Sequence, residues 1–81
     1  MINEYKILSF FGITKDMIFP KGTGLSKDEE HLMEEYLFSN IEAFVQGNIS
    51  FNELKNEFFP DLDIDPSVDS YTKMNNYIKS L

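Results

Sequence analysis

The single histidine, His31, is the first candidate for acid–base chemistry. Carboxylates at Glu30, Glu34 and Glu35 lie close to it in the sequence, and a His–Glu pair can orient an imidazole as a general base. Catalysis also needs a nucleophile and a group that stabilises developing negative charge, and no motif for either is visible. The glycine-containing segment 22–24 lacks the Lys-Ser/Thr ending of a phosphate-binding loop. We therefore interpret His31 as a solvated histidine and predict that the chain is not an enzyme and needs no cofactor.

A second candidate is the acidic segment 61–69. Its aspartates are Asp61, Asp63, Asp65 and Asp69. Alternate residues of a loop can supply the oxygen ligands that calcium requires, and these aspartates match several ligand positions of an EF-hand loop. Pro66 stands where that loop needs glycine, however, and Thr72 where it needs a bidentate glutamate. We predict no metal site and interpret the segment as a solvated connector whose Asp65 caps the last helix. A non-standard calcium-binding loop is the alternative.

Ser26 begins the strongest helical pattern after a long loop, and several carboxylates follow it. This outline resembles that of acyl carrier proteins, which are small acidic four-helix domains with a modified serine at the start of the second helix. The resemblance implies a carrier arm attached to Ser26. The family's motif is Asp-Ser-Leu, whereas this chain reads Leu25-Ser26-Lys27, and an ordinary helix cap also explains the serine.

The segments Phe58-Phe59-Pro60-Asp61 and Asp65-Pro66-Ser67 lie before and at the start of the last helical pattern. They resemble steps in the immunity proteins of nuclease bacteriocins, acidic helical bundles whose short third helix ends in an aromatic-aromatic-proline step. The resemblance implies a scaffold that serves as a protein inhibitor. In that family the step carries tyrosine hydroxyls and lies closer to the second helix.

The composition limits the partners. Fourteen Asp and Glu residues against seven Lys give a net charge of −7, and arginine is absent. This balance argues against direct nucleic acid binding, which needs clustered cations. Because cysteine is absent, disulfides and thiolate metal sites are excluded. No apolar run reaches the roughly 20 residues of a membrane span, and no signal pattern is visible, so we expect a cytoplasmic protein without membrane partners. Lysine-only, asparagine-rich composition suggests a bacterial or phage genome.

Helical periodicity predicts a single domain, 1–81, of the all-α class. We expect a small four-helix bundle, long, long, short and long, over about residues 2–11, 27–46, 51–59 and 66–80. Capping boxes beginning at Ser26 and Ser50 start the second and third helices, and Pro60 ends the third. Gly12 is expected in a left-handed conformation after the first. Residues 13–25 form a long loop whose apolar side chains we expect to lie on the core, with a turn of helix at Thr14–Met17.

The candidate binding surface lies on helix 27–46. At 100° per residue, one polar ridge of this helix contains Glu30, Glu34, Phe38 and Glu42, with His31 and Glu35 beside it. Phe38 then lies opposite an inward stripe that includes Leu32 and Tyr36, and an aromatic ring among charges is typical of a binding hot spot. Phe59, on the short helix, is a second aromatic residue that either contacts a partner or packs inside the protein. The alternative is that Phe38 packs under the 13–25 loop or against a neighbouring helix.

These features predict a small acidic module that binds a basic protein. The predicted partner-binding residues are Glu30, Glu34, Glu35, Phe38, Glu42 and Phe59. The concrete forms are an inhibitor, an antitoxin, an immunity protein, or a phage-encoded inhibitor that occupies a nucleic-acid-binding groove of a host protein. Aligned carboxylates compete for a cationic cleft and accelerate association through electrostatic steering. The carrier domain, the calcium-binding loop and a homodimer that buries the exposed aromatics are the alternatives.

Overall fold

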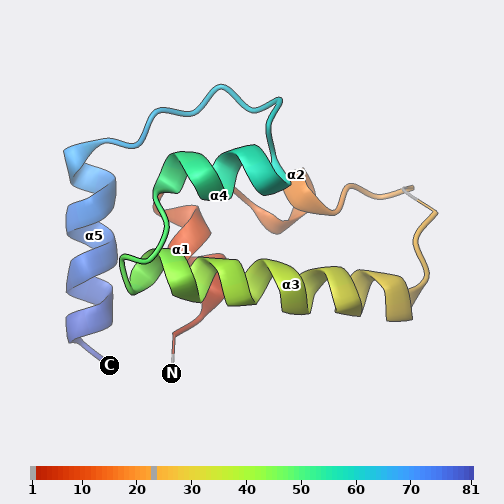
Figure 1. Cartoon of the computed structure of the whole chain (residues 1–81), viewed down its shortest axis with the longest axis horizontal. Coiled ribbons are helices and arrows are strands. Elements are labelled where there is room, and N and C mark those ends of the chain that lie inside the picture. The colour runs from red at the N-terminus through yellow and green to blue at the C-terminus, as the bar shows by residue number, and fades with distance from the viewer. Residues whose placement is uncertain (1, 23) are drawn as a thin grey trace.

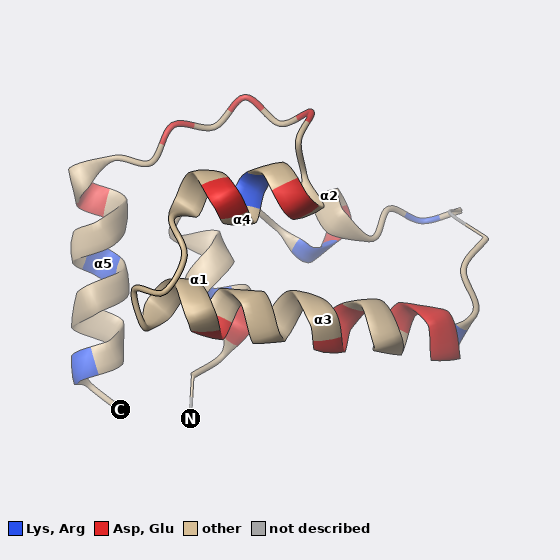
Figure 2. Ribbon diagram, in the orientation of Figure 1, with Lys and Arg blue, Asp and Glu red and all other residues tan. Residues whose placement is uncertain are grey.

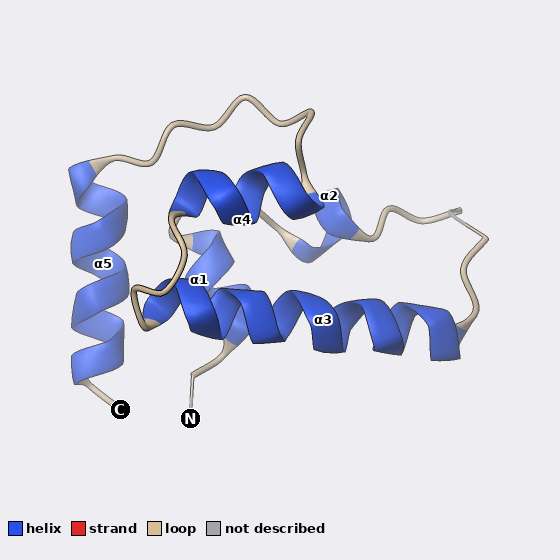
Figure 3. Cartoon of the chain, in the orientation of Figure 1, coloured by secondary structure: helices blue, strands red, loops and turns tan. Residues whose placement is uncertain are grey.

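The computed structural model describes residues 2–22 and 24–81, which form five α-helices and no strand (Figure 3). The helices are α1 (Glu4–Ser9), α2 (Lys15–Ile18), α3 (Lys27–Val45), α4 (Phe51–Phe58) and α5 (Val68–Lys79). The all-helical class is confirmed. The predicted sequence of four helices, long, long, short and long, is wrong, because the first helix has only six residues and α2 forms inside the expected loop.

Local capping sets the bounds of α3 and α4. The Ser26 hydroxyl accepts a hydrogen bond from the Glu29 amide at 3.2 Å, and the Glu29 carboxylate accepts one from the Ser26 amide at 3.3 Å. Ser50 and Glu53 form the same box at the start of α4. Gly47, with φ of +82°, follows the end of α3, where a left-handed residue releases the chain. Both predicted capping boxes are confirmed.

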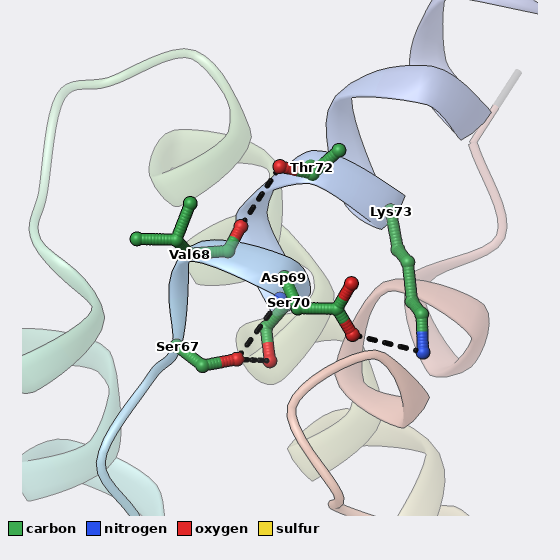
Figure 4. A network of polar contacts seen from close by, with 6 residues as sticks. All are labelled: Ser67, Val68, Asp69, Ser70, Thr72 and Lys73. Carbon is green, nitrogen blue, oxygen red and sulfur yellow. Dashed lines mark hydrogen bonds and ion pairs between the residues drawn. The ribbon is translucent and has the colours of Figure 1, made fainter.

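The first and last helices begin elsewhere than predicted. The Asn3 side chain accepts from the Lys6 amide at 3.1 Å, so α1 begins at Glu4. The Ser67 hydroxyl accepts from the Ser70 amide at 3.1 Å, and α5 therefore begins at Val68 with Ser67, not Asp65, as its cap (Figure 4). Serine and aspartate are equally good caps, so the sequence pattern alone does not separate the two positions.

Two further contacts hold the first turns of α5. The Thr72 hydroxyl donates to the Val68 carbonyl at 2.9 Å, and Lys73 pairs with Asp69 at 3.1 Å (Figure 4). Val68 and Leu81 are exposed, whereas Met74 between them is buried. The inward face of α5 is therefore shorter than the helical pattern suggests.

The core lies where α1, α3, α4 and α5 meet. Helices α3 and α4 run side by side, and α5 crosses the ends of both (Figure 1). The core side chains are Ile7, Leu8, Phe11, Ile13, Leu37, Ile41, Phe44, Phe51, Leu54, Phe59 and Met74. Ile13 is fully buried and Phe19 is 9% exposed, whereas Met17 and Leu25 are exposed, so the prediction that the apolar side chains of the 13–25 loop lie on the core is confirmed only in part.

Phe11 joins three helices. Its ring stacks on Phe51 of α4 with centroids 4.7 Å apart. It also meets Phe44 of α3 edge-on at 5.6 Å and Tyr71 of α5 at 5.3 Å. Gly12 follows with φ of +80°, as predicted, and turns the chain away from this contact.

Replacing Phe11 therefore tests the core. We expect Phe11→Ala to lower the free energy of unfolding by about 3–5 kcal/mol, because it empties a position that three helices share. Phe11→Leu keeps an apolar side chain and should lose less. Val68→Ala, at a position that is 83% exposed, should change the free energy of unfolding by no more than about 0.5 kcal/mol. Urea unfolding measures all three, and equal losses at the two positions would contradict the assignment.

Candidate protein-binding surface on helix α3

Helix α3 carries six of the fourteen acidic residues of the chain (Figure 2). Its carboxylates are Asp28, Glu29, Glu30, Glu34, Glu35 and Glu42, against the single lysine Lys27. Within the described residues, the ion pairs at or below 4 Å are His31–Glu35 at 3.2 Å and Asp69–Lys73 at 3.1 Å. No lysine of that part of the chain therefore neutralises a carboxylate of α3.

One part of the predicted ridge faces α1 instead of solvent. The ring of Phe38 meets that of Tyr5 edge-on with centroids 5.2 Å apart, and the Tyr5 hydroxyl donates to the Glu34 carboxylate. Phe38, Glu34 and Glu30 are all half-buried. Phe38 thus packs against a neighbouring helix, as the alternative interpretation of this residue stated. Leu37, the residue before it, is directed into the core, and this places Phe38 beside α1.

Phe59 does not lie on the surface. It is 5% exposed and belongs to the hydrophobic core, so the prediction that it contacts a partner is wrong. Phe59 is the residue at which α4 ends, and Pro60 directly after it is exposed.

The Tyr5 phenol lies among carboxylates from two helices. Burial raises its pKa, and the hydrogen bond to Glu34 and the charges of Glu34, Glu30 and Glu4 raise it further. The Lys15 ammonium lies 5.6 Å from the centroid of the Tyr5 ring. This cluster connects α1, α2 and α3 through a phenol that remains a hydrogen-bond donor, which is a structural role.

Of the predicted partner-binding residues, Glu35 and Glu42 are exposed, as is His31 beside them. His31 has a side chain that is 72% exposed, and its polar contact is the Glu35 carboxylate one turn later. This arrangement agrees with a solvated histidine on a charged face. Together with Asp28 and Glu29, these residues form the accessible negative surface of α3.

Three apolar side chains on α3 are exposed, and two of them, Leu32 and Tyr36, were predicted to lie on the inward stripe. Leu32 is 65% exposed, Met33 48% and Tyr36 55%. The Tyr36 ring lies 5.2 Å from that of Phe58, and its hydroxyl donates to the Glu57 carboxylate at 2.8 Å, which raises the pKa of Tyr36. We refer to Leu32, Met33 and Tyr36 as the apolar face of α3.

The exposure of the apolar face of α3 could have been predicted from the lengths of the helices. The helix α3 has 19 residues and spans about 28 Å, whereas α4 has eight and spans about 12 Å. A partner helix of that length covers less than half of α3. Both lengths follow from the caps and helix-ending residues of the sequence, so an uncovered end of α3 was predictable.

The candidate calcium loop lies apart from this surface. Asp61, Asp63 and Asp65 lie along the connector between α4 and α5 (Figure 2). Within the described residues, no three Asp, Glu or His side chains are grouped closely enough to hold a metal ion, and no pocket is found. Ser26 is exposed and acts as the cap of α3. None of the described helices has both the length and the apolar composition of a membrane span.

No protein-family model, curated protein or solved structure matches the chain.

The Tyr5 cluster predicts a pH dependence. Above about pH 10, the ordinary pKa of tyrosine, the unfolded chain loses a proton that folded Tyr5 retains, so stability falls as the pH rises. We expect this fall to be smaller in Tyr5→Phe, measured by urea unfolding between about pH 8 and 11. Glu35→Gln removes an exposed charge from α3, the helix that carries Glu34, and should keep the wild-type slope. An unchanged slope in Tyr5→Phe would contradict the prediction.

Proposed function

We propose that this chain is a small acidic protein-binding module that occupies a basic surface of another protein, as an inhibitor or immunity-type protein does. The observation that carries the proposal is the set of α3 carboxylates that no described lysine neutralises. A cationic cleft in a partner would supply the missing counter-charges. The net charge of −7 extends this attraction beyond the contact itself.

The carboxylates of α3 divide into two groups. Those of its first turn interact favourably with the positive end of the helix dipole, and Glu29 also completes the capping box. Glu34 accepts the hydrogen bond of Tyr5. Glu35 and Glu42 are exposed and take part in neither arrangement, so we assign them the main electrostatic contact.

Binding is favoured over catalysis by the surroundings of His31. Its imidazole is exposed, and its polar partner is the carboxylate of Glu35. General base catalysis needs a substrate site beside the base that holds the reacting atom, and an exposed helix face does not enclose one. We therefore propose that the chain acts by occupying a surface of its partner and not by a reaction.

The test is salt-dependent capture. The tagged protein is incubated with lysate of the source organism, and bound proteins are released by raising the salt to about 0.5 M, at which exposed charges are screened. We expect a basic protein to be released, and the double variant Glu35→Lys/Glu42→Lys to capture at least tenfold less of it. Mass spectrometry identifies the protein and quantifies the loss.

The matched control is Asp61→Lys/Asp63→Lys. It changes the net charge by the same amount, at exposed positions on the connector. We expect this variant to retain capture. Equal losses in the two variants would show that net charge alone attracts the protein, and undiminished capture by the α3 variant would contradict the proposal.

A further inference from the structure

We propose that the apolar face of α3 is the centre of the docking surface, and that it binds a cationic amphipathic segment of the partner protein. Such a segment places apolar side chains on Leu32, Met33 and Tyr36 and surrounds them with lysine or arginine. This inference rests on the proposed function and names the chemistry of the partner at that same surface.

The geometry of α3 directs these side chains away from the core. Leu32 and Ile41 are nine residues apart, which at 100° per residue places them on opposite sides of the helix. Their exposure agrees, since Ile41 is fully buried and Leu32 is 65% exposed. Tyr36 lies one turn after Leu32, and Met33 lies beside both. The three side chains thus form a continuous patch.

Tyr36 is held in place before any partner binds. Its hydroxyl donates to Glu57 at 2.8 Å, and its ring lies against that of Phe58, so α4 supports it from one side. More than half of its surface remains accessible. An aromatic side chain that is already ordered loses little conformational freedom on binding, which favours its use as an anchor.

Carboxylates surround the patch. On the helical wheel Glu29 lies between Tyr36 and Met33, while Asp28 and Glu35 border the opposite side of Leu32. All three are exposed. Apolar anchors within a ring of solvated charged residues are the usual arrangement of an interface hot spot.

The charge of this ring selects the occupant. A second copy docked by the same face would place these carboxylates against their own equivalents, and each copy carries a net charge of −7. The apolar side chains alone cover little more than one turn of helix, too little for the roughly 800 Å² per partner of a stable interface. The charged residues must therefore contribute to binding, and they are complementary to a cationic segment.

The probe is a synthetic amphipathic helix of lysine and leucine, with leucines at helical spacing along one face. Its control is an isomer of the same composition with the leucines distributed around the helix. Calorimetry measures both affinities, and amide chemical shifts in the ¹⁵N-labelled protein locate the contact. We expect at least tenfold tighter binding of the amphipathic peptide, with the largest shift changes between residues 28 and 36.

The variant Leu32→Ser/Met33→Ser removes apolar surface without changing charge. We expect it to bind the amphipathic peptide at least tenfold more weakly and to unfold at the wild-type urea concentration, since both positions are exposed. Val68→Ser, at an exposed apolar position on α5, should leave the affinity unchanged.

Three outcomes would overturn the inference: equal affinity for the two peptides, shift changes centred on the connector 60–67, or a dimer in high salt that Leu32→Ser abolishes. The lysate experiment separates this inference from the proposed function. If Leu32→Ser/Met33→Ser still captures the basic protein that Glu35→Lys/Glu42→Lys loses, the acidic module stands and the apolar face is not its centre.

Discussion

The contact of the Phe11 ring with three helices is the interaction on which the rest of the structure depends. Phe11 follows α1 in the chain, and its ring meets Phe51, Phe44 and Tyr71, one residue each from α4, α3 and α5. A domain of 81 residues buries a limited core, so a shared aromatic position determines how its short helices are placed. Because Phe11 is close to α1 in sequence, the same contact also places α1 against α3.

That placement determines the rotation of α3 about its axis. With Leu37 and Ile41 directed inward, Phe38 and its neighbour Glu34 lie beside Tyr5 of α1. The opposite side of the helix, with Leu32, is then left to solvent. The surface proposed for binding is thus a consequence of the core, since no local feature of residues 28–36 requires it.

The negative charge of α3 serves both the fold and the proposed contact. Glu29 caps the helix, and Glu34 accepts the Tyr5 hydrogen bond that also raises the pKa of that phenol. Glu35 and Glu42 have no such structural role in the described residues and remain solvated. A count of acidic residues therefore overstates the charge that a partner can use, and the hydrogen bonds show which part of it is accessible.

The sequence by itself determined the features that depend on neighbouring residues. The capping boxes at Ser26 and Ser50, the turn at Gly12, the end of α4 before Pro60 and the helical class follow from local hydrogen bonding and backbone conformation. The burial of Phe59, the packing of Phe38 and the side of α3 that faces solvent were decided only by the tertiary structure, although the length of α3 already indicated an uncovered end. Apolar residues of α3 occupy more than one side of the helix, and which side is buried depends on residues distant in the chain, such as Tyr5 and Phe11.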